Sequence, residues 1–200
     1  MMRRRAGTTI LGALGALLAG CVSTPESRFF TLSALSAGTN HVAAPSTLSV
    51  VVGPVSVPAA VDRPQIVVST GPNQVRVDDF NRWASPLQSN ISRVVADNLV
   101  TMLGTPRVTV FPQTLSANAD YQAAVEVQSF GSALGEAATL DAVWTVRRVK
   151  DGKLQMGRTT VREPAPERGY EALAAAHSRA VARLSQDIAG AVRALDGLGQ

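Results

Sequence analysis

Cys21 is the single cysteine of this 200-residue chain, and its surroundings point to covalent chemistry. Arg3, Arg4 and Arg5 precede an apolar run over residues 10–19, and the small residue Gly20 stands directly before the cysteine. A basic start, an apolar middle and small residues at the end are the three parts of an export signal. The apolar run is shorter than the roughly 20 residues that a membrane-spanning helix needs. The cysteine therefore stands where the signal is expected to end.

The stretch Leu18-Ala19-Gly20-Cys21 resembles the bacterial lipobox. A thiolate is a strong nucleophile, and small neighbours leave room for the enzymes that process it. The resemblance implies a lipid on the Cys21 thiol, cleavage before the cysteine and acylation of the new amino terminus, with palmitate among the chains. The next residue is Val22 rather than the aspartate that retains lipoproteins in the inner membrane, which favours the periplasmic face of the outer membrane. We therefore expect a signal peptide over 1–20, an acylated tether over 21–27 and one domain over 28–200.

The other residues with reactive side chains form no recognisable catalytic or metal-binding pattern. His41 falls in an expected loop, while His177 lies on the apolar stripe of an expected helix, where a core position is the simpler interpretation. The stretch "GSALG" around Ser132 lacks the Gly-x-Ser-x-Gly spacing of a nucleophile elbow. Asp78 and Asp79 are adjacent on a strand, so they point to opposite faces. We predict a protein that is not an enzyme and has no metal and no cofactor besides the covalent lipid.

The basic charge of the chain does not indicate a nucleic-acid partner. Removing the signal leaves 16 basic against 15 acidic side chains. The remaining basic residues form no cluster with interleaved aromatic residues, which nucleic-acid-binding surfaces show.

The rest of the chain contains apolar patterns of two kinds, one typical of strands and one typical of helices. Strands are expected over residues 28–35, 48–58, 64–70, 73–80, 107–112, 120–130, 137–150 and 153–163. The β-branched run that begins at Leu48 indicates a strand buried on both faces. Asp151-Gly152 predicts a type I′ hairpin between the last two strands. In the strand expected over residues 137–150, Leu140 and Trp144 belong to the expected core face.

Two segments have helical periodicity instead. The first starts after Ser85, the expected N-cap, and Pro86, and ends at Gly104. The second covers residues 170–195. The order of elements predicts an α/β fold, with a single mixed β-sheet and two main helices packed on it.

Packing alone does not explain two further stretches, "VGPVSVPAAVDRPQIV" and "FNRWASPL". They contain residues that are common in protein interfaces, Trp and Arg above all. Our candidate partner interface consists of Asp62, Arg63, Gln65, Arg82 and Trp83. Two interpretations of the second stretch remain open, because Trp83 could instead close the core while Arg82 pairs with Asp62 or Asp79.

The lipobox, "FFTL", the proline-containing stretch and "RWASPL" together resemble the PqiC-type family of ABC-transport auxiliary lipoproteins, over residues 28–195. Ser85 stands where members often carry an acidic residue. The resemblance implies a single three-layer α/β domain of the TolB amino-terminal or anticodon-binding-like kind. It also implies an accessory or docking subunit for an MCE-type (Pqi-like) intermembrane lipid transport system.

The partner implied is a periplasm-spanning MCE-domain protein, and homo-oligomers are plausible by analogy. A lipid- or small-molecule-binding lipoprotein that carries cargo itself is the alternative.

Overall fold

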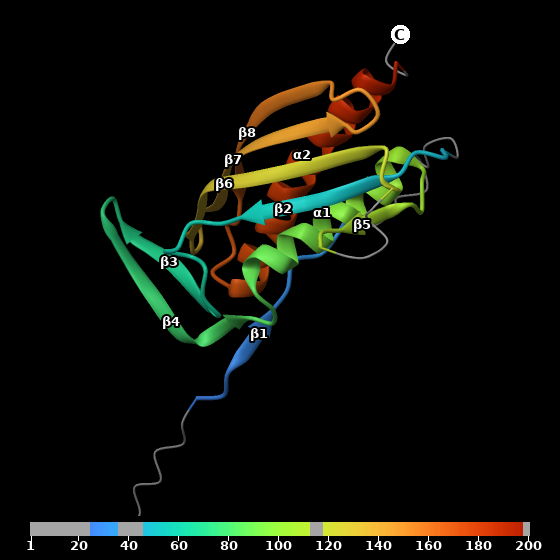
Figure 1. Cartoon of the computed structure of the whole chain (residues 1–200). Coiled ribbons are helices and arrows are strands. Elements are labelled where there is room, and N and C mark those ends of the chain that lie inside the picture. The colour runs from blue at the N-terminus through green and yellow to red at the C-terminus, as the bar shows by residue number, and fades with distance from the viewer. Residues whose placement is uncertain (1–24, 36–45, 113–117, 198–200) are drawn as a thin grey trace, which may run out of the picture.

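The computed structural model describes residues 25–35, 46–112 and 118–197, which form eight strands and two helices (Figure 1). In chain order these are β1 (Arg28–Phe30), β2 (Val50–Ser56), β3 (Gln65–Gly71), β4 (Gln74–Trp83), α1 (Leu87–Leu103), β5 (Val108–Val110), β6 (Tyr121–Ala133), β7 (Ala137–Arg148), β8 (Leu154–Pro164) and α2 (Tyr170–Asp196). The α/β class with a mixed sheet and two main helices is confirmed.

The larger sheet has five strands in the order β5-β2-β6-β7-β8. β2 runs parallel to both of its neighbours, and β6, β7 and β8 form the predicted antiparallel meander. Val50, Val51 and Val52 are all buried, as expected for a strand covered on both faces. Leu140 and Trp144 are buried as well, which confirms the core face of β7.

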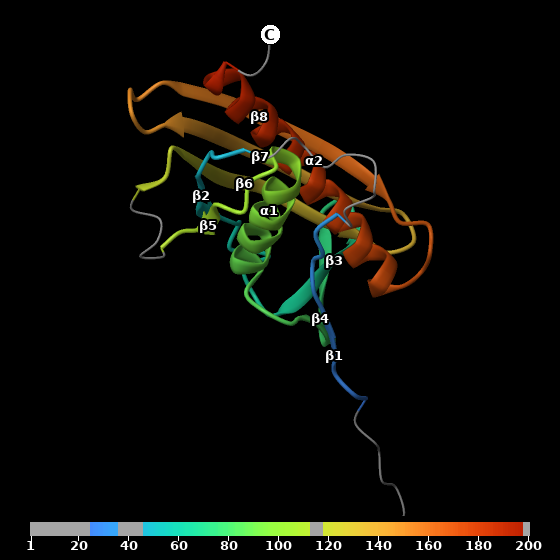
Figure 2. The ribbon, with the colours of Figure 1, turned by 90° about the vertical axis from the view of Figure 1, so that its right-hand side faces the viewer.

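Both helices cover the same face of this sheet (Figures 1 and 2). α1 lies over β2 and β5, α2 lies over β7 and β8, and the helices contact each other. The stripe predicted for the second helix is buried from Leu173 to Val192. A helix with one apolar stripe gains stability by burying it, and a shared sheet face offers both stripes one core.

The strands do not form the single sheet that we expected. β1, β4 and β3 form a separate three-stranded sheet beside the larger one, in the order β1-β4-β3. The chain turns away after β2 through a segment that contains Pro58 and Pro64, which cannot donate to a strand ladder. Register shifts in β3 and β4 bend the small sheet further. The arrangement is therefore a helix layer on one face of the large sheet, with a second, smaller sheet alongside.

Two local predictions were wrong. Pro86, not Ser85, is the N-cap of α1, and it offers no side-chain cap. Gly104, with a left-handed backbone, ends that helix as predicted. The β7–β8 turn is not type I′, because Gly152 has positive φ and Asp151 does not. The turn is closed instead by a hydrogen bond from the Arg148 amide to the Lys153 carbonyl, at 2.8 Å.

Candidate functional site

The structure brings the two candidate stretches together at the start of β3 and the end of β4. Gln65 lies opposite Arg82 in the ladder, and the Trp83 amide donates to the Pro64 carbonyl at 2.7 Å. Asp62 lies in the turn before β3, where its amide donates to the Pro58 carbonyl. Antiparallel pairing of β3 with β4 thus makes neighbours of residues about twenty positions apart.

Four of the five candidate residues reach the surface. The side chains of Asp62 and Arg63 are exposed, and those of Gln65 and Arg82 are half-buried. We call these four residues the polar cluster. Arg82 donates through Nε to the Asp79 carbonyl at 2.9 Å. Within the described part of the chain it forms no ion pair, so the pairing with a carboxylate of Asp62 or Asp79, which one of the two open interpretations included, is not found.

Trp83 belongs to the core rather than to the surface. Only 5% of the residue is exposed, and its ring meets the rings of Phe130 and His177 edge-on, each at a centroid distance of 6.1 Å. Of the two interpretations of this tryptophan, the structure supports the one in which it closes the core. Its side chain faces the core and is not available to a partner.

A serine and a histidine meet in the same core. Ser132 Oγ and His177 Nε2 are 2.8 Å apart, although the residues are separated by 45 positions. The His177 ring stacks on Phe130 at 3.9 Å and is completely buried, which lowers its pKa to about 3. Sequence analysis placed His177 correctly in the core but missed its contact with Ser132, because no local pattern links two such distant residues.

This pair lacks what nucleophilic catalysis needs. An activated serine requires a base that a third group orients, and a path for substrate. His177 Nδ1 has no hydrogen-bond partner among the described residues. Ser132 itself is only 4% exposed. The pair therefore acts as a buried link between β6 and α2.

The chain after β1 forms a strap, residues 31–35, that lies between the two helices. Leu32 is fully buried, and its carbonyl accepts from Arg93 of α1 at 2.8 Å. The Ser33 amide donates to Ser178 Oγ of α2 at 3.1 Å, and the Leu35 amide donates to an Asn98 oxygen at 2.9 Å. In the strap, hydrogen bonds to helix side chains take the place of pairing with a neighbouring strand. The strand expected over 28–35 therefore ends at Phe30.

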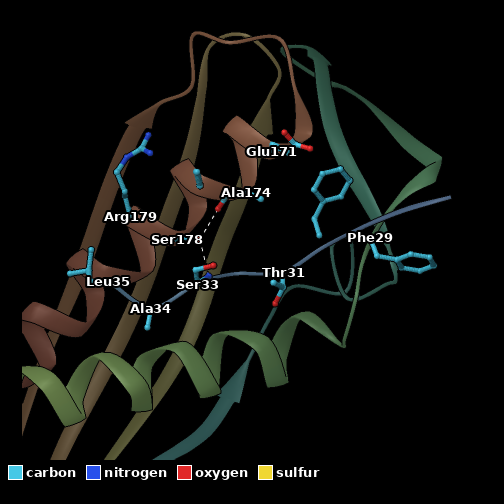
Figure 3. Close-up of a pocket in the computed structure, with 11 residues that line it drawn as sticks. Phe29, Thr31, Ser33, Ala34, Leu35, Glu171, Ala174, Ser178 and Arg179 are labelled. Atoms are coloured by element: carbon cyan, nitrogen blue, oxygen red, sulfur yellow. Dashed lines mark hydrogen bonds between the residues drawn. The ribbon is translucent and has the colours of Figure 1, made fainter. Parts of the chain in front are cut away.

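An open cavity of about 440 Å³ lies between the strap and the first turns of α2 (Figure 3). Leu35, Ala174 and Ala175 give it a largely apolar lining. At one end Glu171 is already paired with Arg28 at 2.9 Å. Phe29 points away from α2 in this view. The cavity has room for an apolar group, but the Glu171 carboxylate already has an ion-pair partner in Arg28.

Cys21, the 1–20 signal and His41 lie outside the described residues, so their predicted roles stay predictions. Within the described ranges, no three His, Cys, Asp or Glu side chains are grouped as metal ligands would be. None of the helices described has the length and apolar character required to cross a membrane.

Comparisons with known proteins agree with this geometry. A crystal structure of an uncharacterized protein matches with a TM-score of 0.68 and 20% identity, covering 84% of this chain and 99% of that one. A Xanthomonas campestris protein of the DUF330 family matches with a TM-score of 0.67 and 20% identity, over 83% and 94%. No curated protein matches the sequence significantly. The family described as the ABC-type transport auxiliary lipoprotein component matches residues 30–189. The chain therefore belongs to the ABC-type transport auxiliary lipoprotein family.

Proposed function

We propose that this protein is an outer-membrane lipoprotein and the docking subunit of an MCE-type, Pqi-like intermembrane lipid transport system. The family match over residues 30–189 carries the proposal, because the family is an auxiliary of transport rather than an enzyme. The lipobox at Cys21 supplies the anchor, and Val22 favours the outer membrane. Its partner would be a periplasm-spanning MCE-domain protein, and several copies of the lipoprotein could surround one partner.

The polar cluster is the proposed docking surface. Its residues come from two segments that pair through the β3–β4 ladder, so the backbone fixes their spacing. Arg63 is exposed, and among the described residues the Arg82 guanidinium donates only to the Asp79 carbonyl. N–H groups of both side chains are therefore open to a carboxylate. Arginine is enriched in interface hot spots for this reason.

Affinity purification of the full-length lipoprotein in mild detergent, with mass spectrometry, tests the role. We expect an MCE-domain protein in comparable amount, and recovery of the lipoprotein alone would reject the role. The Arg63→Ala/Arg82→Ala variant should recover much less of the partner than the wild type does. The control variant, Arg158→Ala/Arg162→Ala, removes two exposed arginines from β8 and should recover as much partner as the wild type. Equal recovery by both folded variants would reject the surface while leaving the role intact.

The cavity beside the strap favours one second candidate, a lipoprotein that binds a lipid or another small molecule itself. Its apolar lining suits an acyl chain better than a polar ligand. Native mass spectrometry of the purified protein distinguishes the two functions. A co-purifying lipid in addition to the covalent one would favour cargo binding, and a mass explained by the acylated chain alone would favour docking.

A further inference from the structure

The small sheet has one face in the core and one apolar face in solvent. Phe30, Ile66, Val68 and Trp83 are buried in the core. The register places Phe29 opposite Arg82, Val67 opposite Val77 and Ser69 opposite Val75, so these side chains share the outer face. We call Phe29, Val67, Val75 and Val77 the apolar face.

Three of these four side chains are unusually exposed for their type, and Val67 is half-buried. Phe29 is 63% exposed, Val75 is 61% exposed and Val77 is 37% exposed. Exposed apolar residues gathered on one surface with a polar border mark a binding site for protein or membrane. The polar border here includes Gln65 and Arg82 from the polar cluster.

The chain enters the domain beside this face. β1 runs parallel to β4, with Arg28 opposite Asn81, so the described chain enters the domain at the edge of the small sheet. Six residues separate Cys21 from Arg28, so even a fully extended chain spans at most about 25 Å. The start of β1 and the β3–β4 hairpin lie on one side of the molecule, and the β7–β8 turn lies on the opposite side (Figure 1).

We infer that the apolar face rests on the phospholipid bilayer that holds the lipid anchor. This inference depends on the anchor of the proposed function. Three or four apolar side chains bind a membrane weakly by themselves. Once an acylated Cys21 holds the domain at the surface, however, the second contact becomes intramolecular and needs little affinity. Phe29 suits insertion among the acyl chains just below the headgroups, where interfacial segments bury Trp, Phe and Leu side chains.

This orientation also puts the polar cluster at the edge of the contact between the domain and the bilayer. Arg82 neighbours Phe29 in the ladder and would lie at headgroup depth, while Asp62 and Arg63, in the turn before β3, remain at the rim. A partner that docks on this rim would meet the lipoprotein at the membrane surface itself.

Fluorescence quenching in proteoliposomes tests the orientation with the full-length acylated protein. The acylated Cys21 carries no free thiol, so one introduced cysteine can be labelled alone. Ser69→Cys places a nitrobenzoxadiazole label on the outer face of the small sheet without removing any apolar residue. Lys153→Cys places it on the β7–β8 turn as the matched exposed control. The vesicles contain phosphatidylethanolamine, phosphatidylglycerol and a doxyl-labelled lipid as the quencher.

We expect quenching about threefold stronger, or more, at position 69 than at position 153. Adding Phe29→Ser and Val75→Ser should remove most of that difference while the protein still floats with the vesicles. Equal quenching at both positions in floating protein would overturn the orientation and leave the anchor intact. A label shielded at position 69 only when the co-purified partner is present would assign the face to a protein instead. If the protein fails to float, the anchor of the proposed function is wrong, and the orientation falls with it.

Discussion

The buried His177 should make the protein less stable as the pH falls from 7 to 5. Its pKa is about 3 in the folded state, because burial penalises the charged ring. In the unfolded chain an ordinary histidine titrates near pH 6.5. Between pH 7 and pH 5 the unfolded state therefore gains a proton that the folded state cannot bind. This proton lowers the free energy of unfolding by about 2 kcal/mol over that interval.

Urea unfolding at pH 7 and at pH 5 measures the effect. Trp83 lies against His177, so tryptophan fluorescence reports on the same region. The comparison is with His177→Phe, which keeps an aromatic ring against Phe130 but cannot titrate. That variant leaves the Ser132 hydroxyl unpaired, so it starts from lower stability at both pH values. Its loss between pH 7 and pH 5 should be smaller than the wild-type loss by about 2 kcal/mol.

His41→Gln is the matched control, because His41 is the only other histidine. Its loss between the two pH values shows how much of the wild-type loss comes from His41 rather than from His177. If His177→Phe also loses as much as the wild type, the reasoning is refuted, since the folded histidine would then titrate normally. Such a result would mean that water reaches Nδ1, the ring nitrogen without a partner among the described residues.

Three further substitutions test the packing that supports the site. Trp83→Ala should cost about 3–5 kcal/mol in chemical unfolding, because it removes a large core ring; a cost below about 1 kcal/mol would contradict its burial. Gly157→Ala should cost about 1–3 kcal/mol by thermal unfolding, since its new methyl group would overlap the Trp144 ring; an unchanged melting temperature would contradict that contact. Asn98→Ala should cost about 1–3 kcal/mol, because its amide donates to Ser185 Oγ and its oxygen accepts from the strap. Faster proteolysis within the strap should accompany that loss, and unchanged proteolysis would show that the amide does not hold it.

The helices and most strands could be predicted from local periodicity. The second helix was expected over 170–195 and covers Tyr170–Asp196, because its apolar residues recur at helical spacing along one face. The meander was predictable for a similar reason, since β7 alternates buried and exposed side chains. In both cases buried positions recur at a regular spacing along the chain. The sequence alone therefore shows the type of element and which of its faces is buried.

The division into two sheets could not be predicted in this way. Strand alternation shows that a segment is extended but not which segment it pairs with. β1 pairs with β4, more than fifty positions further along the chain, and β2 pairs with β6, about seventy positions further along. These partners follow from how the helices and strands pack, which is not a local property.

Residue type also gave only part of the candidate site. Trp and Arg are frequent in interfaces, but a tryptophan is equally suited to a core, and the burial of Trp83 depends on Phe130 and His177. The spacing of the candidates was informative all the same. Gln65 and Arg82 come from two separate stretches, and the structure pairs them directly.

The structure limits how far the domain can move from its anchor. A short tether would matter little if β1 could detach and lengthen it. However, Phe30 packs in the core, Leu32 is fully buried, and the strap is bonded to both helices. Detaching this segment would expose two large apolar side chains, at a cost of about 1.5–3 kcal/mol for each. An acylated Cys21 would therefore keep the start of β1 within about 25 Å of the bilayer, and a partner that docks beside this strand must come close to the membrane.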